Sequence, residues 1–161
     1  TNMTRPYMDY VDKSPCAMRF AMLKKIWQDR KVVLIEGKKS RLGVGNDLFS
    51  TAASVQRILA PATNAFDKYK ELLTRACQLE KDTLILIALG PTATILAYDL
   101  AKCGYQALDI GHVDVEYEWF QMGATSKVPL KNKYVNESLQ GRNIGELQDE
   151  EYISQIIDRI E

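Results

Sequence analysis

Four short apolar runs constrain the fold of this chain more than any other feature of its sequence. Within each run apolar residues follow one another with little alternation, which is typical of strands buried on both faces of a parallel sheet. Glycine or proline closes each run. The runs are Lys31-VVLIE-Gly37, Arg57-ILA-Pro61, Thr83-LILIAL-Gly90 and Tyr105-QALDI-Gly111. We therefore expect a parallel sheet with helices covering both of its faces.

Stretches with helical periodicity lie between these runs. They follow the capping signals Ser14-Pro15, Asn64 and Gly90-Pro91-Thr92. A last stretch with isoleucines at 153, 156, 157 and 160 predicts an amphipathic terminal helix. Strands that alternate with helices predict an α/β fold that is Rossmann-like, with a mostly parallel sheet. Residues 123–148 are polar and contain glycine, so we expect a loop or lid there.

Composition narrows the class of protein. Of the 161 residues, 46% are hydrophobic, which predicts one globular α/β domain over residues 1–161. Lys plus Arg and Asp plus Glu both number 21, so no net charge attracts nucleic acid or an anionic membrane. No apolar run reaches the roughly 18 residues of a transmembrane segment. Three cysteines without C-x-x-C spacing indicate reduced thiols in a cytoplasmic protein.

Two features indicate a piece of a longer domain. The first residue is Thr, and only four strands are predicted, whereas sheets average about five or six. A sheet edge left without a partner strand would favour self-association. We therefore expect the C-terminal portion of a domain whose N-terminal portion is absent here.

The candidate chemistry follows the predicted strands, because ligands of open α/β sheets bind at the carboxyl ends of the strands. Four segments rich in small, polar or charged residues lie at these ends. They are Glu36-GKKSRLGVGND, Pro61-ATN, Gly90-PTAT and Asp109-IGHVDVEYEW.

The first of these segments resembles a phosphate-binding loop only in part. It lacks a Walker lysine, and the residue at position 48 is leucine, so the dinucleotide fingerprint fails. A glycine-bearing backbone beside Lys38 and Arg41 suits a diphosphate, and an exposed basic turn explains the same residues equally well. Gly90-Pro91-Thr92 offers free backbone N–H groups to an anion, although proline at a helix start is also ordinary capping.

The last segment holds four acids and the single histidine, His112. In extended backbone Asp114 and Glu116 would face the same side and could share one Mg²⁺ or Mn²⁺ ion. In a helix their side chains would point about 200° apart and could not bind one ion together. Acids near a helix start are also favoured by the helix dipole alone. Arg5 and Arg57 suit either a phosphate clamp or an ordinary ion pair.

Taken together, these segments resemble the bacterial GT-D-type glycosyltransferases, a family first described as a domain of unknown function. The resemblance runs from about residue 4 to residue 137. It is carried by Thr4-RPYMDY, Ile35-EGKKSRLGVGNDLF, Pro61-ATNAFDKY, Leu89-GPTATILAYDL and Gly104-YQALDIGHVDVEYEW.

The resemblance implies a Rossmann-like fold that binds a nucleotide-sugar donor, typically a UDP-sugar. It also implies a D-x-E motif that works with a divalent cation, usually Mn²⁺, and that falls here on Asp114 and Glu116. The family's genes lie among those for adhesin glycosylation and polysaccharide synthesis. The family's N-terminal half carries an arginine and a Gly-Asp-Gly-Glu-like segment that this sequence lacks, so the chain resembles the family's C-terminal part.

The resulting hypothesis is a metal-dependent glycosyltransferase that moves a sugar from a nucleotide diphosphate to a saccharide or glycopeptide acceptor. Glu36 or Asp109 would orient the sugar or act as general base, and Asp114 and Glu116 would hold the cation. A non-catalytic nucleotide-binding module and another nucleotide-processing α/β enzyme are the alternatives. The residues expected to bind the donor are Arg5, Lys38, Ser40, Arg41, Gly43, Gly45, Asn46, Asp47, Asn64, Gly90, Pro91, Thr92 and His112.

Overall fold

The computed structural model of the chain describes residues 4–135, 137, 144–145 and 147–161. Its centre is a five-stranded sheet with the order β4-β3-β1-β2-β5, in which every pair of neighbours is parallel. The four predicted strands are confirmed, and the second begins three residues earlier than its apolar run. The strands are β1 (Lys31–Gly37), β2 (Ser54–Ala60), β3 (Leu84–Ala88), β4 (Gln106–Asp109) and β5 (Ile156–Arg159).

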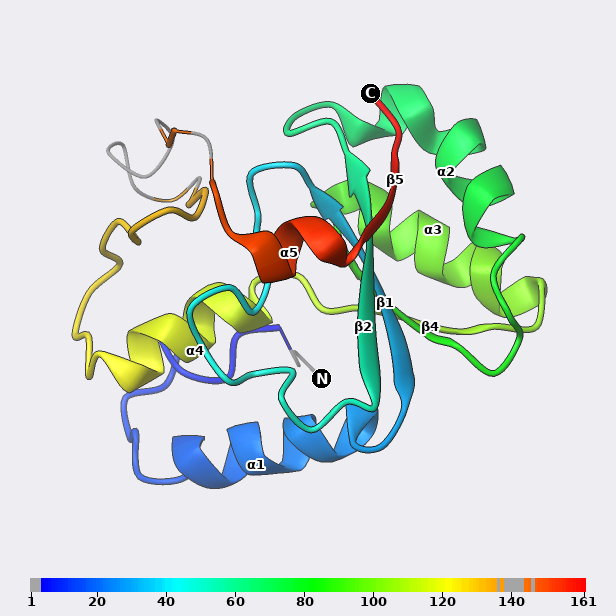
Figure 1. Cartoon of the computed structure of the whole chain (residues 1–161). Helices are drawn as coiled ribbons and strands as arrows, with labels where there is room; N and C mark the ends of the chain where they lie inside the picture. Colours follow the sequence, from blue (N-terminus) through cyan, green and yellow to red (C-terminus); the bar gives the residue numbers. More distant parts are fainter. Residues whose placement is uncertain (1–3, 136, 138–143, 146) are drawn as a thin grey trace.

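Helices cover both faces of this sheet (Figure 1). One face packs against α1 (Cys16–Trp27) and α4 (Val113–Gln121), and the other against α2 (Tyr69–Ala76) and α3 (Pro91–Lys102). A short 3₁₀ helix, η1 (Ala65–Lys68), leads into α2. Successive side chains of a strand point to opposite faces, so the continuous apolar runs supply both cores. The predicted α/β class is therefore confirmed.

The prediction of one terminal helix was wrong. The segment forms a short helix, α5 (Glu150–Ser154), and then extends as β5 beside β2. Asp149 caps α5 by accepting a hydrogen bond from the backbone N–H of Tyr152. Isoleucine favours strands, and the free edge of β2 offers a row of backbone partners that a helix would leave unpaired. β4 and β5 form the sheet edges, and self-association stays a prediction.

Residues 38–53 cross one face of the sheet without forming a helix or strand. They lead from the carboxyl end of β1 to the amino end of the parallel β2. Leu42, Leu48 and Phe49 are buried in the core beside α1 and α4. Trp27 fixes the crossing further, because its indole N–H donates to the carbonyl of Leu48 at 2.8 Å. The glycine-bearing segment is thus anchored in the core, whereas its sequence suggested a flexible turn.

The strand order places a topological switch point between the carboxyl ends of β1 and β3. The chain leaves β1 toward β2 on one side and leaves β3 toward β4 on the other. Such switch points are where open α/β sheets bind ligands. Within the described part of the chain, no helix is both long and apolar enough to cross a bilayer. Cys16, Cys77 and Cys103 are free thiols, as their spacing indicated.

Candidate functional site

Glu36 lies at the carboxyl end of β1, fully buried, and is held by two donors. Arg57 of β2 donates from Nη1 to Oε1 at 2.6 Å, and the backbone N–H of Leu42 donates to Oε2 at 2.7 Å. Burial raises the pKa of the Glu36 carboxyl, and the Arg57 charge opposes that rise. A carboxylate enclosed in this way does not suit direct contact with substrate. Glu36 is thus one partner of a buried ion pair, which does not favour a catalytic role, and that role stays a prediction.

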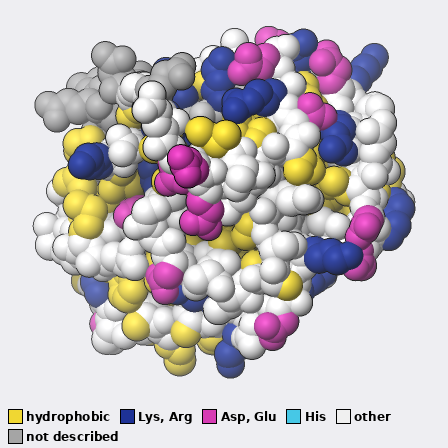
Figure 2. Space-filling view, in the orientation of Figure 1, with side chains coloured by type: hydrophobic (Ala, Val, Ile, Leu, Met, Phe, Trp, Pro, Cys, Tyr) yellow, Lys and Arg dark blue, Asp and Glu magenta, His cyan; other side chains and the backbone are white. Residues whose placement is uncertain are grey.

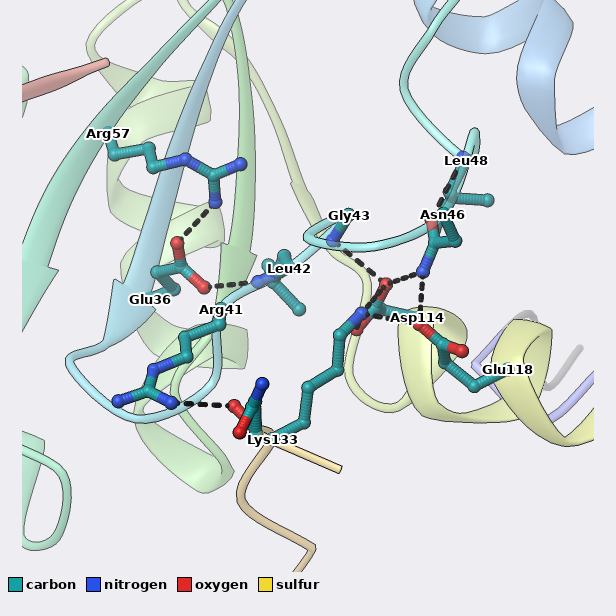
Figure 3. Close-up of polar contacts among 11 residues, drawn as sticks. Glu36, Arg41, Leu42, Gly43, Asn46, Leu48, Arg57, Asp114, Glu118 and Lys133 are labelled. Atoms are coloured by element: carbon teal, nitrogen blue, oxygen red, sulfur yellow. Dashed lines mark hydrogen bonds and ion pairs between the residues drawn. The ribbon is translucent and has the colours of Figure 1, made fainter. Parts of the chain in front are cut away.

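Asp114 joins α4 to the glycine loop, which we define as Gly43–Asn46 (Figure 3). Its Oδ1 accepts hydrogen bonds from the backbone N–H of Gly43 at 2.8 Å and from Nδ2 of Asn46 at 2.9 Å. The buried Lys133 ammonium lies 2.7 Å from Oδ2 and 2.8 Å from Oε1 of Glu118. A carboxylate, a loop and a lysine from three separate segments therefore form one buried ionic cluster.

The arrangement does not fit one cation shared by Asp114 and Glu116. Residues 113–121 form α4, so side chains two positions apart leave the helix about 200° apart. The carboxylate of Asp114 faces the glycine loop, whereas that of Glu116 accepts from the backbone N–H groups of Tyr7 and Met8. Among the residues that the structure describes, no three acidic, histidine or cysteine side chains gather closely enough for a metal. The two carboxylates therefore do not form one shared cation site, and the metal dependence of the protein stays a prediction.

Arg5 lies between two carboxylates on the other side of α4. Its guanidinium donates to Glu137 through two nitrogens and lies 3.4 Å from Oε1 of Glu116. The hydrogen bond from Arg5, helped by the charges of His112 and Lys127, lowers the pKa of Glu137 to about 2. Arg5 is thus engaged in ion pairs that tie the N-terminal segment to residue 137. The sequence left two roles open for Arg5, a phosphate clamp or an ordinary ion pair, and the structure shows ion pairs.

The ion pair between Arg5 and Glu137 predicts a pH-dependent stability. The folded-state pKa of Glu137 is lowered from 4.5, so its contribution is present above pH 4.5 and is lost as the pH falls toward about 2. We expect Glu137→Gln to lower the free energy of unfolding by about 1–3 kcal/mol at pH 7. The difference from the unmodified protein should vanish in acid. Urea denaturation across this range measures it, with Glu71→Gln on the surface as control; a pH-independent difference would contradict the assignment.

Two further donor-binding candidates, Arg41 and Asp47, are engaged in contacts with other parts of the protein. Arg41 is buried and donates to the carbonyls of Asn132 and Gly145. Asp47 lies 2.7 Å from the Lys24 ammonium and accepts from the Tyr117 hydroxyl, and the Lys24 hydrogen bond lowers its pKa. These contacts hold the crossing segment in place, so the expectation of a free basic loop around Arg41 was wrong.

The remaining donor-binding candidates are spread along the edge. Lys38 is exposed and lies 3.3 Å from Glu161, and the backbone N–H of Ser40 closes a tight turn onto Gly37. Asn64 is exposed before η1. Their roles stay predictions.

Four other candidates lie at the carboxyl edge of the sheet, near the switch point between β1 and β3. Gly90 precedes α3 with a φ of 56°, and Pro91 and Thr92 begin that helix. Asp109 ends β4 half-buried, where it accepts from the Thr94 hydroxyl at 2.8 Å and from the backbone N–H of Gly111. Of the two acids proposed for catalysis, Asp109 is the accessible one.

Two glycines of the loop allow a matched test of its packing. Gly43 and Gly45 have φ values of 74° and 79°, which disfavour side chains. A Cβ on Gly43 would lie 2.6 Å from the Phe49 ring, whereas one on Gly45 would meet nothing within 4 Å. We expect Gly43→Ala to cost about 2–4 kcal/mol of stability and Gly45→Ala about 1–2 kcal/mol. Chemical denaturation measures both, and equal losses would contradict the packing.

Sequence reasoning missed several members of these clusters. Lys133 and Glu137 lie in a stretch interpreted only as a loop or lid, and no local pattern marks them. Arg57 carried a signal, because a charged residue inside a buried strand needs a buried partner. Tyr152 was overlooked because the terminal segment was interpreted as one amphipathic helix.

Comparisons with known proteins agree with the fold. A family model described as the glycosyltransferase GT-D fold matches residues 1–138. The chain is 48% identical over 157 residues to a probable glycosyl transferase Gly of Streptococcus gordonii, covering 98% of the chain and 23% of that protein. It is 46% identical over 160 residues to glycosyltransferase GlyD of Streptococcus pneumoniae serotype 4 (strain ATCC BAA-334 / TIGR4), covering 99% and 20%. The chain thus spans about a fifth of the length of these relatives.

Solved structures show the same likeness. One described as a new glycosyltransferase (DUF1792) from Streptococcus sanguinis superposes with a TM-score of 0.94 at 46% identity. The match covers 99% of this chain and 59% of that one. Another, described as a domain of unknown function 1792 with a distinct glycosyltransferase fold, has a TM-score of 0.92 at 46% identity over 57% of its length.

Proposed function

This chain belongs to the glycosyltransferase GT-D family, and we propose that it takes part in the transfer of a sugar from a nucleotide-diphosphate donor to a saccharide or glycopeptide acceptor. The observation that carries the proposal is the identity of 46–48% over nearly the whole chain to proteins named glycosyltransferases. The parallel sheet with a switch point between β1 and β3 supports it, because that edge is suited to a nucleotide.

The residues at this edge divide into binding and reacting groups. The backbone at the start of α3, after Gly90, offers N–H groups and the positive end of the helix dipole to the donor diphosphate. Asp109 would orient the sugar or accept the proton of the acceptor hydroxyl. On the other side of the switch point, the ion pair of Glu36 and Arg57 ties the end of β1 to the middle of β2.

The finer features of this proposal rest on the family resemblance. They are a UDP-sugar as donor, a divalent cation as cofactor, and a place in bacterial surface polysaccharide or adhesin glycosylation. Such a cation would neutralise the leaving diphosphate.

Donor turnover tests the proposal directly. The intact protein is incubated with a panel of UDP-sugars and saccharide acceptors, with Mn²⁺, with Mg²⁺ and with chelator. Acceptor-dependent appearance of glycosylated product is the expected result. Nucleotide release that does not depend on acceptor would instead identify a hydrolase, and donor binding without turnover would identify a binding module.

A further inference from the structure

A cavity of about 350 Å³ lies between the glycine loop, β2 and α5. Gly43–Asn46 form one wall, Arg57 lies in the second and Tyr152 in the third. In Figure 1 α5 crosses in front of the sheet above the crossing segment that carries this loop. We call this space the α5 cavity. Gly43, Gly45 and Asn46 of its wall were among the residues expected to bind the donor, whereas Gly90 and Asp109 of the proposed donor site do not line it.

The α5 cavity lies against the first half of β2, where Val55 and Arg57 line it. Arg57 links this place to the carboxyl end of β1, because its Nη1 reaches Glu36 there. A ligand against Arg57 would therefore lie on the β2 side of the switch point proposed for the donor. A glycosyltransferase needs such a neighbouring position, since the acceptor hydroxyl must approach the donor sugar.

The charges around the α5 cavity exclude a second diphosphate as its natural ligand. The positive charge of Arg57 is compensated by Glu36 at 2.6 Å. Asp149 and Glu151 add two carboxylates at the wall. Near the centre of the face in Figure 2, where Figure 1 places α5, acidic side chains gather on the surface. With Arg57 paired to Glu36, the other charged groups that line the cavity are the two carboxylates, which disfavour phosphates and accept hydrogen bonds from hydroxyl groups.

Some carboxylate oxygens in the cavity wall accept no hydrogen bond from the described residues. Asp149 Oδ1 caps α5, and Glu151 Oε1 accepts weakly from Gln155. For the second oxygen of each carboxylate the described residues supply no hydrogen bond. A ligand that carries several hydroxyl groups can fill these positions at once.

The buried hydroxyl of Tyr152 is a second, independent observation that points to a ligand in the cavity. The side chain is 6% exposed, and its hydroxyl is enclosed without a hydrogen-bond partner among the described residues. Burial raises the pKa of this phenol to about 12, so it stays protonated and able to donate. Buried hydroxyls in native proteins are nearly always satisfied, and one left alone needs an explanation.

We propose that the α5 cavity binds the acceptor saccharide. The inference rests on the proposed glycosyl transfer and names the site of its second substrate. Asp149 and Glu151 accept hydrogen bonds from sugar hydroxyls, and the Tyr152 hydroxyl bonds a further sugar oxygen. A neutral hexose or N-acetylhexosamine unit has the hydroxyl groups and the lack of charge that this wall requires.

Two variants and two matched controls test the proposal. Tyr152→Phe removes only a hydroxyl that has no hydrogen-bond partner among the described residues, so it preserves the fold. Glu151→Gln removes a charge from an exposed position of the cavity wall. The controls are Tyr98→Phe on α3, and Glu150→Gln, the neighbouring exposed acid of α5 that does not line the cavity.

The probes are methyl glycosides of neutral hexoses and N-acetylhexosamines, added to the intact protein. Their dissociation constants are measured by NMR with ¹³C-labelled tyrosine, and acceptor and donor KM values by transfer assay. We expect both cavity variants to weaken saccharide binding and raise acceptor KM by about 10-fold, the loss of one hydrogen bond. UDP affinity and donor KM should not change, and the controls should change nothing.

The outcomes separate the two proposals. Saccharide binding that depends on Tyr152, without any transfer, would support the cavity and refute the proposed function. Active transfer with unchanged acceptor KM in both cavity variants would overturn the cavity assignment and leave the function standing. Perturbation of the labelled Tyr152 ring by UDP or by Mn²⁺ but not by any glycoside would also overturn it.

Discussion

Replacing Arg57 by methionine is expected to lower the free energy of unfolding by about 3–5 kcal/mol, which is the usual cost of breaking a buried ion pair by removing one partner. Arg57 and Glu36 have side chains that are 5% and 0% exposed. Methionine fills much of the same volume but leaves the Glu36 carboxylate in the core with only the Leu42 N–H as donor. The loss therefore comes from an uncompensated charge and not from a cavity.

The double variant Glu36→Gln/Arg57→Met should recover a large part of this loss. Glutamine is neutral and its side-chain oxygen still accepts from Leu42. Lys31→Met is the control, because Lys31 belongs to an exposed ion pair with Glu80 and should cost at most about 1 kcal/mol. Urea denaturation of the four proteins measures these differences. A loss for Arg57→Met no larger than that of the control would show that the pair does not support the fold.

The same variant has a defined pH dependence. Burial raises the pKa of Glu36 above 4.5, and removing Arg57 removes the charge that opposes this rise. A group whose folded pKa is raised favours folding at low pH, and this contribution is lost as the pH rises. The deficit of Arg57→Met relative to the unmodified protein should therefore shrink as the pH falls toward 4.5.

The sheet was predictable from sequence because its signal is local. Residues 31–37 and 83–90 have β-branched and leucine runs that only a strand buried on both faces explains. The isoleucines of 153–160 were ambiguous, since spacings of three and four suit a helix and β-branching suits a strand. The pairing of Ile156 with Arg57 decided between them. That pairing joins residues about a hundred positions apart, which no local pattern encodes.

The candidate site was less predictable because its contacts are long-range. From the sequence alone, Asp114 and Glu116 could lie either in an extended segment or in the first turn of a helix, because acidic residues suit both positions. Once α4 forms, the two carboxylates take different partners, the glycine loop on one side and the N-terminal segment on the other. Lys133 joins the first group from a stretch with no periodicity at all.

Replacing Asp114 by alanine is expected to lower the free energy of unfolding by about 3–5 kcal/mol. Lys133 is 2% exposed, and without Asp114 its ammonium keeps only the carboxylate of Glu118, at 2.8 Å. The backbone N–H of Gly43 and the amide of Asn46 lose an acceptor in the same step. The variant thus removes the closer of the two carboxylate partners of a buried cation, and it takes an acceptor from two donors.

Lys133→Met tests the same cluster from the other side, because it leaves the buried Asp114 carboxylate with only neutral donors. We expect a loss of similar size for this variant. For Asp114→Ala/Lys133→Met, in which both charges are gone, we expect a loss smaller than the sum of the two single losses. Lys131→Met is the matched control, an exposed lysine of the same segment that should change stability by less than about 0.5 kcal/mol. Denaturation of the set gives the coupling energy between the two positions. A double variant whose loss equals the sum of the single losses would show that Lys133 does not compensate Asp114, and that the cluster holding the glycine loop against α4 is wrongly assigned.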